Sequence, residues 1–234
     1  MVSSISSFIT QMSFVFLVSV ANNLLGKYGM ESKYGAEVPL AVVGIVMKVS
    51  QILNSIVIGI AVGSQPIWGY NYGARKLDRV KQTLKIVLRL SIAIMAVAFV
   101  LFQAIPDKLI RVFGNGDCNY IEFACITFRS YLLLCVAAGV QIPAGIFFQA
   151  IGKSVESAVL SLSRQILFLI PAMIVLGHVF GIIGVLYAGA VADGLALLLS
   201  STLLIFAIKK LSNSKVIMQT LSDDIKDLQA DLCK

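Results

Sequence analysis

Long apolar runs, separated by short polar turns, make up most of the sequence. The runs cover about residues 5–25, 39–67, 84–104, 121–150, 159–176 and 185–208. A helix needs about 20 predominantly apolar residues to cross the hydrocarbon of a bilayer. The pattern therefore predicts an all-α, polytopic membrane protein, with six transmembrane helices in one lobe over residues 1–211 and a polar cytoplasmic tail over residues 212–234.

The junction between the second and third runs holds the densest polar signal, IGIAVGSQPIWGYNYGARKLDRVKQTLK over residues 58–85. The incoming helix is expected to break at Pro66, since proline lacks the backbone N–H and clashes with the preceding turn. Trp68, Tyr70 and Tyr72 are predicted to anchor this end of the helix at the membrane interface. Proline is also expected to kink the fourth run, at Pro143.

Composition excludes several classes of protein. Hydrophobic residues make up 58% of the chain and charged residues 13%, which is too apolar for a soluble domain. The net charge of +7 is concentrated in short loops, so a nucleic-acid partner is disfavoured. The four cysteines form no C-x-x-C pair, and no catalytic motif is present. We expect no enzyme activity, no cofactor and no metal site.

The loop charges predict the orientation in the membrane, because Lys and Arg concentrate in cytoplasmic loops. The loops assigned to the inside hold Arg75, Lys76, Arg79, Lys81, Lys85, Arg89, Lys153, Arg164, Lys209, Lys210 and Lys215. Those assigned to the outside hold Lys27, Lys33, Lys108 and Arg111. Both termini are therefore predicted to be cytoplasmic.

Two charged residues inside the apolar runs are candidates for function, because a charge at membrane depth is costly and usually faces a cavity or a partner. Lys48 lies in the second run, with Gln51 and Asn54 one to two turns further along. The alternatives are a structural lysine for Lys48 and an interhelical hydrogen bond for Asn54. Asp193 is the acidic residue deep in a run, and could bind a coupling proton or serve only as a structural aspartate.

Three motifs, in the same order and spacing, resemble the MATE family of multidrug efflux transporters. G-x-x-x-G-x-Q-P-I-x-G-Y-N-Y-G-A-R, from Gly59 to Arg75, is similar to that family's junction between helices 8 and 9. The segment from Phe147 to Leu176 resembles helices 10 and 11, and the segment from Gly181 to Asp193 resembles the entry to the last helix. The junction motif rests on Gln65, Pro66, Gly69, Tyr70, Asn71, Gly73 and Arg75.

The resemblance implies a fold of about twelve helices in two lobes, of which this chain matches the second lobe, helices 7–12. It also implies outward pumping of cationic drugs, driven by a proton or sodium gradient. The cavity-facing positions carried over are Gln11, Asn22, Lys48, Gln51 and Gln141. The sodium-coupled branch of the family holds acids in helices 7 and 10, whereas the membrane-embedded parts of the matching runs hold none here. Asp193 is then a weak candidate for ion coupling.

These observations predict part of a multidrug efflux transporter that exports cationic small molecules by proton- or sodium-coupled antiport. We expect it in the bacterial inner membrane, in contact with lipid and paired with a first six-helix lobe. Two alternatives stay open. One is an inactive or regulatory membrane fragment of a truncated gene, and the other is a lipid or polysaccharide exporter of the same superfamily.

Overall fold

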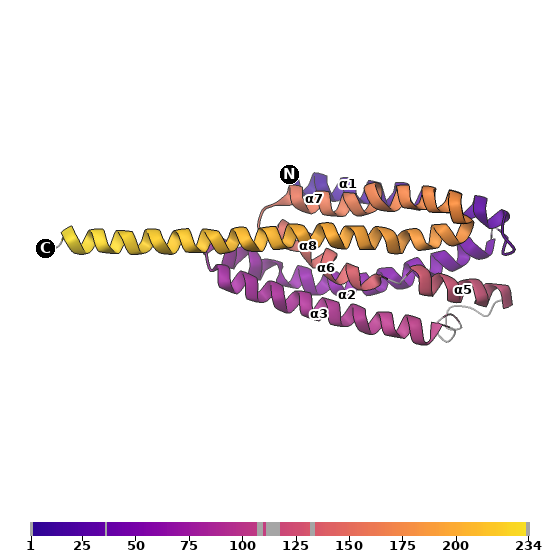
Figure 1. Cartoon of the computed structure of the whole chain (residues 1–234), viewed down its shortest axis with the longest axis horizontal. Coiled ribbons are helices and arrows are strands. Elements are labelled where there is room, and N and C mark those ends of the chain that lie inside the picture. The colour runs from indigo at the N-terminus through magenta and orange to yellow at the C-terminus, as the bar shows by residue number, and fades with distance from the viewer. Residues whose placement is uncertain (1, 36, 107–109, 111–117, 132–133, 233–234) are drawn as a thin grey trace.

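The computed structural model describes residues 2–35, 37–106, 110, 118–131 and 134–232, with side chains described only within residues 11–210. Its helices lie side by side in one elongated bundle, and no strand occurs in the part of the chain that is described (Figure 1). The predicted all-α membrane fold is therefore confirmed. The chain's two ends lie toward the same end of the bundle (Figure 1).

The helices follow the predicted runs closely, with longer ends. They are α1 (Val2–Met30), α2 (Glu37–Gly73), α3 (Leu77–Ala104), α5 (Cys118–Tyr131), the short η1 (Cys135–Ala137), α6 (Ala138–Ala150), α7 (Ser154–Leu162), the π-helical η2 (Ser163–Leu169) and α8 (Ile170–Leu232). Within the described residues, three helical stretches are long and apolar enough to span a membrane, or four if the bent pair α5 and α6 counts as one span.

The last helix, α8, consists of two rods joined at a sharp reversal. Gly181 has φ 61° and ψ −140°, a backbone conformation that glycine adopts without steric cost. The ribbon of α8 turns back on itself at the end of the bundle away from the C-terminus (Figure 1). A side chain at Gly184 would collide with the Leu176 carbonyl, so the two rods meet backbone to backbone. The fifth and sixth runs are therefore joined by a tight connection at Gly181.

Two predicted breaks are misplaced. Pro66 lies inside α2, which continues to Gly73, so the prediction of a break there was wrong. Proline is tolerated within long membrane helices, because nearby groups can satisfy the freed carbonyl. The fourth run is interrupted between α5 and α6, whose axes are bent by 42°. Pro143 lies within α6 and is not the site of that interruption.

The turns after α2 and after α6 are built alike. Lys76 donates its backbone N–H to the Asn71 carbonyl at 2.8 Å, and Lys153 does the same to the Phe148 carbonyl at 2.8 Å. Such a bond closes a helix end when the residue before the donor is left-handed. That residue is Gly152 in one turn, with φ 80°, and Arg75 in the other, with φ 57°.

Trp68 belongs to the core and not to the membrane interface. Its side chain is 0% exposed, and its ring meets the Phe147 ring edge-on with centroids 5.5 Å apart. The expectation of an interfacial anchor at Trp68 was therefore wrong, whereas Tyr70 is exposed. The reason is that α6 packs against this end of α2, as the contacts between their side chains show.

Candidate functional site

Polar side chains interrupt the apolar surface of α2 along one face. Lys48, Gln51 and Ser55 are all exposed, and their spacings of three and four residues place them on one side of a helix. Ser55 donates its hydroxyl to the Gln51 carbonyl at 2.8 Å. The structure thus confirms neither a partner nor a ligand for Lys48, but it leaves the ammonium group on the surface of this lobe.

The candidates on α1 lie on a second exposed surface. Gln11 and Asn22 are exposed, as is Ser19 between them. Spacings of eight and three residues again keep these three side chains on one face of the helix. Helices α1 and α2 are packed against each other through Leu17, Ala21 and Val43. Neighbouring helices of the lobe therefore each carry an exposed strip of polar residues.

Asp193 lies inside the bundle and is bound by a second charged residue. Nε of Arg164 donates to Asp193 Oδ1 at 2.7 Å, and Nη2 of Arg164 lies 2.7 Å from the same oxygen. Asp193 is 7% exposed, whereas the Arg164 side chain retains 36% of its accessible surface. A carboxylate in a medium this apolar is stable when an opposite charge and donors reach it directly.

A small polar cavity adjoins this ion pair. It has a volume of about 20 Å³, enough for one water molecule. Its walls come from α2, η1, α6, η2 and α8, namely Ser50, Asn54, Cys135, Ala138, Arg164, Leu169, Gly189 and Asp193. Gln141 ties α6 to the same region, because its Nε2 donates to the Asp193 carbonyl at 3.1 Å. The structure therefore brings Gln141 and Asp193 together.

The pairing corrects one prediction and adds residues that the sequence did not reveal. Arg164 was assigned to a cytoplasmic loop, but it lies in η2 within the fifth apolar run. Its partner is 29 positions away along the chain. A charge within an apolar run was the available signal for Arg164. Nothing in the sequence pointed to Ser50 or Cys135 as neighbours of Asp193.

The junction motif has a structural role at the end of α2. Asn71 is buried, and its Nδ2 donates to the Ile67 carbonyl at 2.8 Å. Gly69 approaches the Ala150 carbonyl, 3.5 Å from where a Cβ would stand, so α2 and α6 lie close there. Gln65 is half-buried, while Pro66, Tyr70 and Gly73 are exposed. The motif therefore fixes a turn and a close helix contact.

The opposite end of the lobe is closed by one contact cluster. Lys33 donates to Glu122 Oε1 at 2.9 Å, and the Tyr34 hydroxyl donates to the same oxygen at 3.2 Å. The hydrogen bond to the Glu122 carboxylate raises the pKa of the Lys33 ammonium group. The Tyr34 ring also lies 4.8 Å from the Phe123 ring. This cluster ties the α1–α2 turn to α5.

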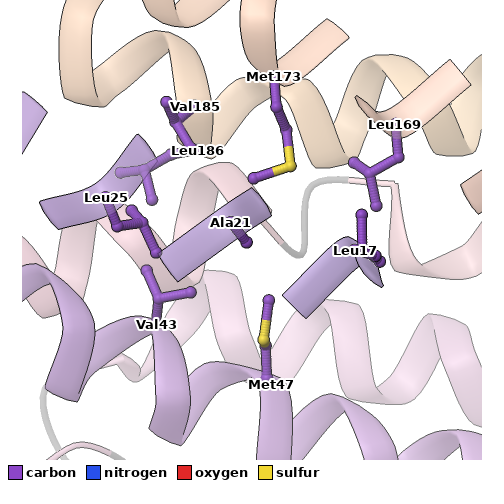
Figure 2. Close-up of a pocket in the computed structure, with 9 residues that line it drawn as sticks. All are labelled: Leu17, Ala21, Leu25, Val43, Met47, Leu169, Met173, Val185 and Leu186. Carbon is purple, nitrogen blue, oxygen red and sulfur yellow. The ribbon is translucent and has the colours of Figure 1, made fainter. Parts of the chain in front are cut away.

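A second, apolar cavity lies where α1 meets α2 and both rods of α8. Figure 2 shows the side chains that line it, with two methionine sulfurs pointing toward the gap from opposite sides: Leu17, Ala21, Leu25, Val43, Met47, Leu169, Met173, Val185 and Leu186. Its volume is about 10 Å³, too small for a drug-sized ligand. It is a packing gap in the core. Across the described part of the chain, no cluster of three or more metal-ligating side chains occurs.

Comparisons by sequence and by structure find the same group of proteins similar to this chain. Residues 3–175 match the model of the family described as MatE. The chain is 23% identical over 154 residues to "Multidrug export protein MepA" of Staphylococcus saprophyticus, covering 66% of this chain and 34% of that protein. The protein of the same name from Staphylococcus haemolyticus is 23% identical over 174 residues, covering 74% of this chain and 36% of that protein.

Solved transporters share the fold at low identity. A MATE crystal structure in the bent conformation matches with a TM-score of 0.81 and 15% identity, over 91% of this chain and 46% of that one. VcmN, a MATE transporter of Vibrio cholerae, matches with a TM-score of 0.75 and 16% identity, over 91% of this chain and 45% of that one. This chain spans about a third of the length of the curated relatives and just under half of the solved chains. It belongs to the MatE family.

Proposed function

We propose that this chain forms the second six-helix lobe of an exporter of small molecules. The observation that carries the proposal is the agreement in extent: nine-tenths of this chain superimposes on 45–46% of solved MATE transporters. The relatives named as multidrug export proteins support an export function. No enzyme activity is part of the proposal, since the relatives are named as transporters.

The exposed polar faces of α1 and α2 support the idea that a first lobe covers this one. Lys48 and Gln51 on α2, and Gln11 and Asn22 on α1, are exposed at positions that lipid would otherwise contact. Charged and polar groups inside a membrane normally face a cavity or the bundle interior. We assign these four side chains, together with the half-buried Gln141 on α6, to one wall of a substrate cavity between two lobes.

Alternating access in such a transporter moves one bundle against another around a site at their interface. The substrates are proposed to be cationic drug-like molecules, exported in exchange for protons or sodium across a bacterial inner membrane. The positive charge of Lys48 then requires that the carboxylates that attract the cation come from the first lobe. Asp193 is only a weak candidate for ion coupling, because Arg164 already neutralises its charge.

The proposal is tested in a drug-sensitive host that carries an empty vector, this chain alone, or this chain with a matching first lobe. Export of a cationic dye should appear only with both lobes, and collapse of either the proton gradient or the sodium gradient should abolish it. Dye export by the chain alone above the vector level would refute the need for a first lobe. If both lobes reach the membrane at wild-type levels and no substrate moves, the chain is an inactive fragment and the export proposal is wrong.

A further inference from the structure

Helix α7 is a short rod between two irregular segments. It holds nine residues, Ser154–Leu162. On one side, a turn joins it to α6 through Gly152, whose φ is 80°. On the other side, it runs directly into the π-helical η2. Both ends of the rod therefore meet backbone that departs from the α-helix.

The segment η2 is a weak point of the fifth apolar run. A π-helix is wider than an α-helix, and such segments are rare and often lie at functional sites. Pro171 follows two residues after η2, and it has no N–H to donate to the Leu167 carbonyl. Sharp bends in helices occur at π-helical segments and at prolines, and both features meet here.

One ion pair ties this weak point to the rest of the bundle. Arg164 is the second residue of η2, and it is bound through two nitrogens to Asp193 on the second rod of α8. Asp193 is nearly buried, while over a third of the Arg164 side chain is accessible. The Arg164 side chain is therefore the more accessible partner of the pair, whereas the Asp193 carboxylate is enclosed by the bundle.

The surroundings of this pair leave room for movement. The polar cavity of about 20 Å³ lies against both Arg164 and Leu169, the second and last residues of η2. The rod itself is joined to α6 by a hydrogen bond that Gln149 Nε2 donates to the Ser157 hydroxyl, 3.0 Å long. The rod's outer side chains Val155 and Val159 are exposed. The described part of the lobe leaves this side of the rod uncovered.

We propose that α7 swings as a rigid rod about η2, and that the Arg164–Asp193 ion pair is the latch that holds it against the bundle. The movement displaces the start of α7, which lies beside the last turns of the α8 span at one end of the lobe (Figure 1). The inference concerns motion within this lobe, and it stands whatever substrate the full transporter carries.

Distance measurements between spin labels test the latch in the full chain reconstituted in lipid bilayers. The four native cysteines are replaced by alanine, and labels are placed at Val155 on α7 and Phe206 on α8, which are both exposed. Val155 lies about 16 Å along the helix from the middle of η2. A change in bend of about 20° therefore moves it by about 5 Å. The wild-type chain should give one main distance, and Asp193→Asn should add a second population shifted by about 5 Å.

The matched control is Glu156→Gln, which removes the ion pair between Glu156 on the rod and Lys153 just before it and leaves the latch intact. Its distances should superimpose on those of the wild type. Identical distributions for Asp193→Asn and wild type would overturn the proposal, as would the same second population in Glu156→Gln.

A milder variant covers the case in which Asp193→Asn does not accumulate in the membrane. Arg164→Lys keeps the positive charge but cannot make the two-pronged bond of a guanidinium group. It should show the same shifted population in a smaller proportion. A wild-type distribution in Arg164→Lys, with protein of wild-type abundance, would equally overturn the latch.

Discussion

Lys48 is the residue whose charge most directly tests the proposed cavity wall. A unit charge about 8 Å from a bound cation, at an effective dielectric constant of about 40, opposes binding by about 1 kcal/mol. Lys48→Gln should therefore lower the KM for export of a cationic dye about five-fold in the two-lobe transporter. The assay compares dye export at matched protein levels.

A suitable control is Lys85→Gln, since Lys85 is also exposed but lies on α3. It should leave the KM unchanged. An unchanged KM in Lys48→Gln would show that the ammonium group does not face the substrate path. The lysine would then be structural, which was the alternative left open by the sequence.

Trp68 should matter for stability far more than its exposed neighbour Tyr70. Trp68→Ala removes a fully buried ring that packs on Phe147, and such losses cost about 3–5 kcal/mol of unfolding free energy. Tyr70→Ala, at a side chain 73% exposed, should change the unfolding free energy by less than about 0.5 kcal/mol. Denaturant unfolding of the purified chain in detergent measures both.

A third variant separates ring packing from the polar group of Trp68. Among the described residues, none offers a hydrogen-bond partner to the buried indole Nε1 of Trp68. Trp68→Phe keeps most of the ring and removes this unpaired N–H, so it should cost clearly less than Trp68→Ala. Equal losses in the two variants would contradict the packing explanation.

At the scale of helices, α3 and α6 approach each other backbone to backbone. A Cβ built on Gly139 would stand 3.0 Å from the Ser91 carbonyl oxygen and 3.2 Å from Ile92 Cα. Backbone atoms cannot give way as a flexible side chain can. Gly139→Val should therefore force the two helices apart and destabilise the chain by about 1–3 kcal/mol. Thermal unfolding in detergent provides the measurement.

Gly59 supplies the comparison, because a Cβ there would meet no atom of the described residues within 4 Å. Gly59→Ala should be neutral or slightly stabilising, since alanine favours the helix by about 1 kcal/mol over glycine. If Gly139→Val unfolds at the same temperature as the wild type, the contact between α3 and α6 is looser than the structure has it.

Hydrophobic pattern was enough to locate the helices, because each apolar run must be buried in lipid or in the bundle. It was not enough to locate their irregularities. Pro66 and Pro143 both suggested breaks, yet the interruptions lie after Tyr131 and within Ser163–Leu169. A proline removes one hydrogen bond, and whether the helix bends there depends on neighbours that the local sequence does not contain.

Predicting the residues of the candidate functional site from the sequence met the same limit. Lys48 and Gln51 were recognised because charge and polarity in an apolar run are visible in one dimension. The bond between Arg164 and Asp193 was not predicted, because it depends on the reversal at Gly181 that brings the second rod of α8 back along the first. Topology, and not spacing along the chain, created that pair.

At the scale of the whole molecule, the two ends of the bundle differ in charge. The α2–α3 turn, the α6–α7 turn and the last turns of the α8 span share one end (Figure 1). The basic residues of these segments and of the first turns of α3 are Arg75, Lys76, Arg79, Lys81, Lys85, Lys153, Lys209 and Lys210. Lys27 and Lys33 are the basic residues of the described segments near the α1–α2 turn, at the other end. The charge asymmetry survives the removal of Arg164 from the loop count.

Because basic residues concentrate on the cytoplasmic side, we predict that both termini face the cytoplasm. Native cysteines offer a first test, with Cys118 expected outside and Cys233 inside. Cys233 lies outside the described residues, and the side chain of Cys118 is not described. Two exposed positions, Glu31 in the α1–α2 turn and Ala74 in the α2–α3 turn, are better placed.

In a cysteine-free background, Glu31→Cys should react with a membrane-impermeant maleimide in intact cells. Ala74→Cys should react only after the membrane is opened, because the two turns lie at opposite ends of the bundle (Figure 1). The reverse pattern would invert the topology and place the basic end outside. Reaction of both positions in intact cells would contradict a lobe that spans the membrane between these turns.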